Sequence, residues 1–155
     1  MPLLRAALSW NFVLATAICA SLLAQLIKVL LNLFIFHRFI AERMWGAGGM
    51  PSSHSATVCA MVVATGRYCG INSPIFAIAA VLSIIVMYDA MGVRYETGEQ
   101  AKVLNRMFTE WMDQGFEQFQ LPHGKKLKEM VGHTPIEVVT GAALGIVLGF
   151  AMPMV

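Results

Sequence analysis

The sequence predicts an all-α fold: a polytopic membrane helix bundle with about four transmembrane helices and one amphipathic helix at the membrane interface. Two observations support this prediction. Of the 155 residues, 57% are hydrophobic and only 13% are charged, which is too few charges for an ordinary soluble surface. The apolar residues also gather in four long runs separated by polar segments. We therefore expect a single membrane-embedded domain over residues 1–155, with an amphipathic or lid region at about 95–132.

The first apolar run predicts a helix that begins at residue 6 or 9 and ends at residue 36, longer than the ~20 residues that a bilayer core needs. This run is too long for the core of a signal peptide, so we interpret it as a membrane helix. Gln25, Lys28 and Asn32 fall on one stripe of it at 100° per residue. A lysine here either snorkels to the headgroups or faces a polar interior, and its two polar neighbours favour the interior.

The octet Gly-Gly-Met-Pro-Ser-Ser-His-Ser, residues 48–55, opens the second helix. Its glycines free the backbone, and Pro51 fixes φ as in the first turn of a helix. Ser52 and Ser53 place hydroxyls beside His54. Unpaired N–H groups and the positive end of the helix dipole favour a bound phosphate or similar oxyanion. A serine-capped helix with a histidine at the interface explains the octet alone equally well.

The second and third helices are expected at about residues 54–68 and 75–91, and the fourth from Thr134 to the C-terminus. Thr134, Pro135 and Glu137 have the pattern of a capping box with proline at the first helical position, which gives Glu137 a structural role. Small residues recur every four positions on the second and fourth helices, which favours close packing within the bundle or, on the fourth helix, a dimer seam. These residues are Ala56, Ala60, Ala64, Gly141, Gly145 and Gly149.

Residues 95–132 form the one extended polar region. Thr97 and Gln100 have the spacing of a capping box, and an apolar stripe at helical spacing follows them. We expect an amphipathic helix that lies on the membrane or over the site, either as packing alone or in contact with substrate. A basic cluster follows that would attract anionic lipid headgroups, made of Lys125, Lys126 and Lys128.

Cysteine spacing and net charge argue against several other classes. Cys19, Cys59 and Cys69 are odd in number and have no paired spacing, so we interpret them as small core residues rather than a disulfide framework or a zinc signature. A net charge of +2, without basic and aromatic residues interleaved, predicts no nucleic-acid partner. No cofactor is expected.

Because consecutive spans alternate direction, one side of the bundle receives the end of the first helix, the start of the second, the end of the third and the start of the fourth. Positive charge, a nucleophile and an acid for the leaving oxygen are the parts needed to transfer a phosphoryl group. An ion pair between Asp89 and Arg94 that serves only the interface is the simpler reading of those two residues. The side chains expected on this side are Lys28, Arg38, His54, Arg94, His133 and Glu137.

These residues resemble a known superfamily. Pro51-Ser52-Ser53-His54 resembles the Pro-Ser-Gly-His motif of the type 2 phosphatidic acid phosphatase and vanadium haloperoxidase superfamily. The segment Gly132-His133-Thr134-Pro135-Ile136-Glu137 is similar to its third motif, in which an aspartate follows the histidine by four residues. Lys28 with Arg38 is similar to its first motif. The ensemble most resembles the small divergent bacterial branch described as acid phosphatase/vanadium-dependent haloperoxidase-related, over nearly the full chain.

The resemblance implies a role for each residue. His133 would attack phosphorus to form a phosphohistidine, Glu137 would orient it, and His54 would protonate the leaving alkoxide and then activate water. Lys28, Arg38 and Arg94 would bind the phosphate oxygens at the helix start marked by Ser52 and Ser53. The chain has Leu127 where the family has an arginine, so Arg94 would take over that arginine's role, with Lys128 as the second choice.

Four other departures from the family pattern stand out. Lys28 and Arg38 are ten residues apart where the family has seven, and no proline follows Arg38. Ser53 replaces a glycine, and Glu137 replaces an aspartate.

The leading hypothesis is a metal-independent membrane phosphatase that hydrolyses a lipid phosphate or diphosphate. The alternative is a non-catalytic membrane protein that binds anionic lipid headgroups or a partner helix, and a homo-oligomer is left open. A metal site made of His54, His133 and Glu137 is a third interpretation without a ligand-spacing signal. We expect an integral protein of the bacterial plasma membrane, and the excess of Lys and Arg on the site's side predicts that this side is cytoplasmic.

Overall fold

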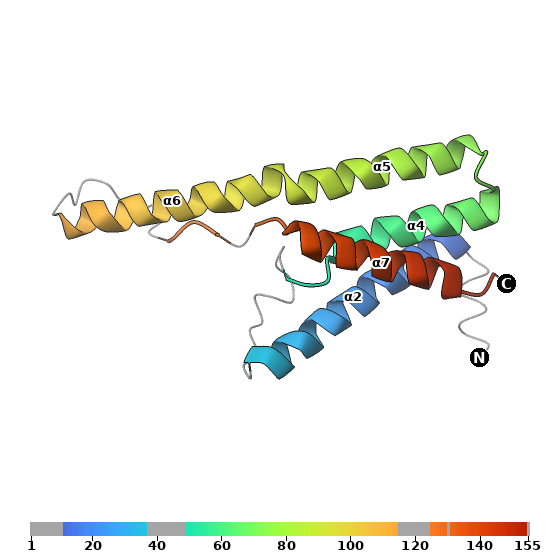
Figure 1. Cartoon of the computed structure of the whole chain (residues 1–155), viewed down its shortest axis with the longest axis horizontal. Coiled ribbons are helices and arrows are strands. Elements are labelled where there is room, and N and C mark those ends of the chain that lie inside the picture. Colours follow the sequence, from blue (N-terminus) through green and yellow to red (C-terminus); the bar gives the residue numbers. More distant parts are fainter. Residues whose placement is uncertain (1–10, 37–48, 115–124, 130, 155) are drawn as a thin grey trace.

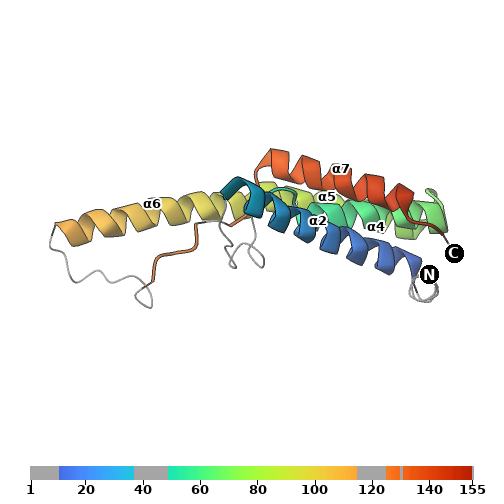
Figure 2. The same cartoon turned by 90° about the horizontal axis from the view of Figure 1, so that it is seen from below.

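The computed structural model describes residues 11–36, 49–114, 125–129 and 131–154, and these residues form helices without any strand. The helices are α2 (Phe12–Phe36), α4 (Ser53–Cys69), α5 (Pro74–Met91), α6 (Val93–Asp113) and α7 (Pro135–Ala151). Helices α2, α4 and α7 pack against one another, α5 packs along α4, and α6 continues α5 beyond the bundle (Figures 1 and 2). The predicted all-helical fold is confirmed.

The starts of three helices follow from the sequence. Ser52 caps α4, Ser73 caps α5, and Thr134 precedes α7. Proline is the first residue of both α5 and α7, where its missing N–H would have had no helical partner. The predicted capping box of α7 is present, with the Glu137 carboxylate accepting from the Thr134 N–H at 3.1 Å. The predicted ranges of the second, third and fourth helices therefore agree with α4, α5 and α7 to within one or two residues at each start.

The core consists mainly of small side chains. Ala20 and Ala24 of α2 meet Ala56 and Ala60 of α4 with no exposed surface. On α7, a Cβ added at any of the three glycines spaced four apart would collide with α4. The colliding groups are the backbone of Ser52 at Gly141, the backbone of Ala56 at Gly145 and the Val63 side chain at Gly149.

The predicted close packing of these small residues within the bundle is confirmed. The glycine face of α7 is used inside the chain, so it is not available as a dimer seam. A homo-oligomer stays a prediction.

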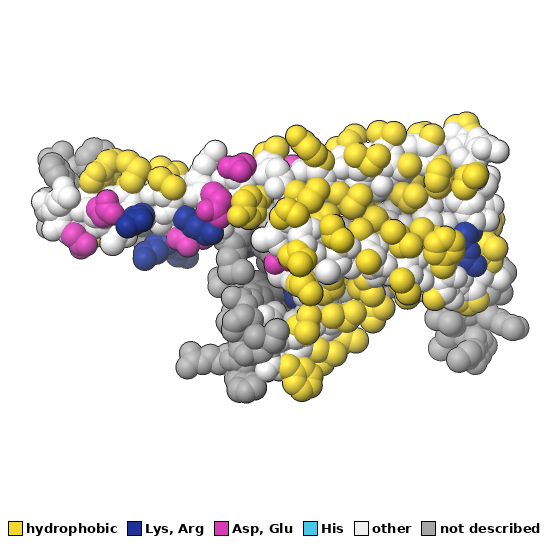
Figure 3. All heavy atoms as spheres, viewed as in Figure 1, with side chains coloured by type: hydrophobic (Ala, Val, Ile, Leu, Met, Phe, Trp, Pro, Cys, Tyr) yellow, Lys and Arg dark blue, Asp and Glu magenta, His cyan; other side chains and the backbone are white. Residues whose placement is uncertain are grey.

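Within the part of the chain that the structure describes, two helical stretches are long and apolar enough to cross a membrane, Phe12–Phe34 and Pro74–Asp113. Only 28% and 17% of their most apolar windows are buried in the protein, unlike the core helix of a soluble protein. Apolar side chains cover the visible face of the bundle (Figure 3). At 1.5 Å per residue, the 17 residues of α4 and of α7 span about 25 Å, slightly less than the ~30 Å of a bilayer core.

Helix α6 differs from its prediction in where it begins and where it goes. It starts at Val93, directly after Gly92, rather than at Thr97. The expected capping box at Thr97 is wrong, because the Thr97 hydroxyl donates to the carbonyl of Val93 inside the helix at 2.7 Å. The helix runs away from the bundle as a continuation of α5 instead of folding across its end (Figures 1 and 2). Its predicted amphipathic character is confirmed, with apolar side chains along one edge and charges along the other (Figure 3).

Candidate functional site

Ser52 joins the starts of α4 and α7. Its side chain has no exposed surface, and its hydroxyl oxygen accepts from the Ser55 hydroxyl at 3.0 Å and from the Ser55 N–H at 3.4 Å. Its N–H donates to the Glu137 carbonyl at 3.0 Å. The Ser52 hydroxyl therefore caps the helix. The first two helical N–H groups, of Ser53 and His54, have no intrahelical acceptor by their position.

The polar stripe of α2 faces this helix start. Gln25 Nε2 donates to Ser53 Oγ at 3.4 Å, while its Oε1 is buried without a hydrogen-bond partner. Lys28 is only 2% exposed, and its methylene groups would lie 3.5–3.8 Å from a Cβ at Gly49. The side chain of Lys28 thus faces the protein interior, as the stripe predicted, instead of snorkelling to the headgroups.

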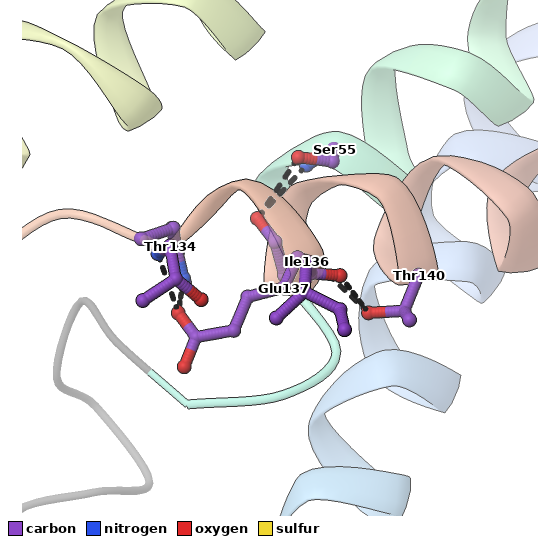
Figure 4. Close-up of polar contacts among 7 residues, drawn as sticks. Ser55, Thr134, Ile136, Glu137 and Thr140 are labelled. Atoms are coloured by element: carbon purple, nitrogen blue, oxygen red, sulfur yellow. Dashed lines mark hydrogen bonds and ion pairs between the residues drawn. The ribbon is translucent and has the colours of Figure 1, made fainter.

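His133 and Glu137 form a hydrogen-bonded pair at the start of α7. Glu137 Oε2 lies 3.1 Å from His133 Nδ1 and accepts from the Thr134 N–H at the same distance. Figure 4 shows the Glu137 side chain folded back onto Thr134, with the first turn of α7 facing Ser55. The capping role and the histidine-orienting role, which the sequence offered as alternatives, therefore fall on one carboxylate oxygen.

The other nitrogen of His133 is the most informative atom of the site. The ring is 2% exposed, and Nε2 is buried with no hydrogen-bond partner among the described residues. Because Nδ1 faces a carboxylate, the favoured tautomer carries its proton on Nδ1 and a lone pair on Nε2. An imidazole held this way can act as a nucleophile.

The His54 ring, in the first turn of α4, lies close to the His133 ring, just before α7. The ring centroids are 6.2 Å apart, with an interplanar angle of 62°. His54 is exposed, unlike His133. The charges of Arg94 and Lys28 act on the His54 ring, and that of Lys28 also acts on His133. Two imidazoles distant in sequence thus lie close together, and the charges of Lys28 and Arg94 reach the His54 ring.

Burial is the largest cause that lowers the pKa of His133 below its ordinary value. The hydrogen bond and charge of Glu137 raise it, while the charges of Lys28 and His54 lower it further. The balance favours the neutral ring at physiological pH, which is the form that can attack an electrophile.

Arg94 lies at the start of α6, where its Nε donates to Asp89 Oδ2 at 2.5 Å. The simpler reading of this pair, as partners of each other, is therefore correct for Nε, while the terminal guanidinium nitrogens take no part in that contact. Lys128 is exposed and is not among the charges that act on either histidine. Arg38 lies outside the described residues.

A cavity of about 130 Å³ lies on the far side of Glu137, between the starts of α6 and α7. Three carboxylates and one lysine contribute to its lining, so it suits water or a polar group better than a phosphate. Among the residues described, no group of three His, Cys, Asp or Glu side chains could hold a metal ion, and the metal-site interpretation gains no support. The charged lining residues are Glu99, Lys102, Glu129 and Glu137.

Sequence reasoning assigned no function to Asn105 or Arg67, although both make buried or partly buried polar contacts between distant segments. Asn105 stands inside an apolar helical stripe, which is the one sequence signal that marks it. In the sequence, Arg67 is notable only as a cation on the side of the membrane opposite the candidate site.

Comparisons with known proteins agree with these features. A family model described as the divergent PAP2 family matches residues 9–148. A protein of Bacillus subtilis (strain 168), named uncharacterized membrane protein YuiD, is 38% identical over 144 residues, which cover 89% of this chain and 91% of that protein. No solved structure gives a significant match.

Proposed function

The chain belongs to the divergent PAP2 family, and from this premise we propose that it is a membrane-embedded phosphatase that hydrolyses a lipid phosphate or diphosphate through a phosphohistidine intermediate. The observation that carries the proposal is the state of His133. Its Nδ1 is held by Glu137, its Nε2 is buried without a partner, and the His54 ring lies 6.2 Å away.

In the first step, the Nε2 lone pair of His133 attacks phosphorus. A P–N bond forms, the P–O bond to the leaving group breaks, and His54 gives its proton to the departing oxygen. Glu137 stabilises the positive charge that develops on the His133 ring.

In the second step, the neutral His54 takes a proton from water, and the resulting hydroxide attacks phosphorus. The P–N bond breaks, inorganic phosphate leaves, and both histidines return to their starting states. His54 suits this role because its ring is exposed and can exchange protons with solvent.

The phosphate oxygens would be bound by the start of α4 and by the cations that act on the histidines. The N–H groups of Ser53 and His54 point from a helix N-terminus, which favours an anion. Lys28 and Arg94 supply positive charge, and Arg38 remains a candidate from its sequence position alone. Electrostatic stabilisation of this kind is the main resource for phosphoryl transfer without a metal.

We place the site on the cytoplasmic face of the bacterial plasma membrane. The support is the excess of Lys and Arg on the side that holds the histidines, against Arg5 and Arg67 on the other. Cysteine labelling of intact cells tests this. Reaction of a cysteine engineered within residues 115–125 with an impermeant reagent added from outside would overturn the placement.

The direct test is phosphate release from a phospholipid phosphate or a polyprenyl diphosphate by the purified protein in proteoliposomes. We expect turnover that vanadate inhibits and a metal chelator does not, and that His133→Ala lowers by more than about a thousandfold. Arg106→Gln is the matched control, since Arg106 is exposed on α6 and pairs only with Glu110 among the described residues. Normal turnover in His133→Ala would exclude the mechanism.

One observation favours a second candidate, a non-catalytic protein that binds anionic headgroups. The His133 ring is only 2% exposed, so a phosphate reaches Nε2 only after neighbouring groups shift. This candidate predicts binding of phosphatidic acid vesicles without turnover, and binding that His54→Ala leaves intact.

A further inference from the structure

The segment that leads into His133 is attached to α6 rather than to the bundle. The described residues of this return segment, 125–129 and 131–133, run beside α6 before the chain reaches α7 (Figure 1). Its contacts with α6 involve the described residues 127, 129, 131 and 132. A helix that lies largely outside the bundle thus holds the approach to the candidate nucleophile.

Asn105 makes the central contact of this arrangement. Its side chain is 4% exposed, and its Oδ1 accepts from the Leu127 N–H at 2.8 Å. Its Nδ2 donates to the Leu127 carbonyl at 2.9 Å and to Glu129 Oε1 at 2.8 Å. Because the peptide N–H of Leu127 requires an acceptor, the orientation of the amide is fixed, and Asn105 binds both polar groups of one residue.

Two glycines bring the segment close to α6 on the side of Asn105 toward His133. A Cβ at Gly98 would lie 2.6 Å from the Glu129 carbonyl oxygen, so the segment touches the helix backbone there. Gly132 has φ +86°, and a Cβ on it would collide with the backbone of Tyr95. Side chains at either position would push the segment off the helix.

The attachment ends at His133 itself. The His133 N–H donates to the carbonyl of Ala90, at the end of α5, at 2.9 Å. The backbone of His133 is therefore fixed by the junction of α5 and α6, while its ring is fixed by Glu137. A loss of either contact would let the ring move relative to His54.

We propose that Asn105 is a positioning residue for His133: by holding Leu127 and Glu129 it keeps the return segment on α6 and the His133 ring in its buried place beside Glu137. The proposal rests on the proposed function for its catalytic consequence, but its structural content does not. Misplacement of a reacting group by about 1 Å can cost up to a hundredfold in rate.

The test is hydrogen–deuterium exchange at C2 of the histidine rings, read by mass spectrometry as a function of pH in the full-length protein. We expect Asn105→Ala to speed exchange at His133 and to raise its pKa toward 6.5, because a released segment admits water to the ring. Glu137, Lys28 and His54, the charged groups that face His133, remain in the variant. The control is Gln100→Ala, which removes an exposed amide from the same helix.

A second variant guards against a failure to fold. Glu129→Ala removes an exposed side chain and only one of the three hydrogen bonds of Asn105, so we expect an intermediate shift at His133. In the phosphatase assay, Asn105→Ala should lower kcat by about tenfold or more with KM unchanged.

The two proposals fail in different ways. Unchanged His133 exchange in both Asn105→Ala and Glu129→Ala would overturn the positioning role, whatever the activity. A shift at His133 in the variants, together with no phosphatase activity in the wild-type protein, would support the positioning role and contradict the proposed function.

Discussion

The two ends of α7 differ in how their polar groups are paired. The C-terminal end is tied by hydrogen bonds, whereas the N-terminal end leaves a reactive nitrogen without a partner among the described residues. At its C-terminal end, Arg67 of α4 donates from Nη1 to the carbonyls of Gly149, Phe150 and Met152 at 2.6, 3.1 and 2.7 Å. The guanidinium also lies 5.6 Å from the centre of the Phe12 ring. At the N-terminal end, Glu137 satisfies Thr134 and one nitrogen of His133, and the other nitrogen stays unpaired.

This difference teaches where to look for chemistry in a bundle of small side chains. A buried polar atom without a partner destabilises a protein by about 1–3 kcal/mol, so its retention calls for a reason. At the Arg67 end, three carbonyls at the end of α7 already accept from Arg67 Nη1. The His133 end retains such an atom beside a second histidine and two cations, and the next four predictions test this contrast.

The largest effect is expected at Glu137. Glu137→Gln keeps a side chain that can complete the capping box but removes the charge that holds His133, so we expect a loss of roughly a thousandfold in kcat. The melting temperature of the same sample should change by no more than a few degrees. A loss of activity that only accompanies unfolding would assign Glu137 to the helix cap alone.

Arg67→Met should show the opposite pattern. Removing the guanidinium leaves three carbonyls without their donor, and we expect the free energy of unfolding to fall by about 2 kcal/mol. Activity per folded molecule should stay at the wild-type level. Lys102→Met, which removes an exposed lysine from α6, is the control for loss of a cation and should leave stability unchanged within error. An inactive but stable Arg67→Met would show that the ends are not independent.

Arg94→Gln is expected to have a smaller effect on activity, about tenfold in kcat/KM, because the residue is half exposed and already shares its charge with Asp89. Arg106→Gln, another ion-paired arginine of α6, should have no effect. Equal values for the two variants would remove Arg94 from the phosphate site.

The smallest effect is on the pH profile. His133 must be neutral to attack, and its pKa is below its ordinary value, so the loss of kcat/KM on the acidic side should set in only below about pH 6.5. Lys28→Met removes a charge that lowers this pKa, so the acidic limb should move to higher pH. Titration of the substrate phosphate is common to both enzymes, so the difference between their limbs belongs to the protein. An unchanged limb would exclude Lys28 as a neighbour of His133.

The lowered pKa of His133 also makes the stability of the folded protein depend on pH. The unfolded chain binds a proton at His133 at a higher pH than the folded protein does, so protonation favours unfolding as the pH falls below about 6.5. Above that pH the contribution is complete. Thermal unfolding of the wild type and of His133→Gln over this range measures it by difference.

The sequence predicted the helices and the convergence of the site because both depend on local patterns. Proline and serine or threonine mark the starts of α4, α5 and α7, and the alternation of four spans brings His54 and His133 to one side. The rows of alanine and glycine predicted close packing, which places the two helix starts side by side.

The rest depended on contacts between distant segments, which no local pattern encodes. The pairing of Asn105 with Leu127 joins residues 22 positions apart, and that of Arg67 with Gly149 joins residues 82 positions apart. Thr97 has the spacing of a capping residue, yet α6 begins four residues earlier, at Val93. It can do so because α6 continues in the direction of α5 after Gly92. From the sequence, Ser52 is a candidate to bind phosphate. In the structure it is buried, and its hydroxyl caps α4.

The backbone contact of the α7 glycines with α4 fixes the start of α7, and with it Glu137, relative to His54 without help from the surrounding lipid. When a bilayer thins or thickens, helices respond by tilting. Because α4 and α7 touch through main-chain atoms at Gly141 and Gly145, they must tilt as one body, and Glu137, which holds the His133 ring, keeps its place relative to His54. Turnover should therefore vary little across vesicles made from lipids of different acyl-chain length.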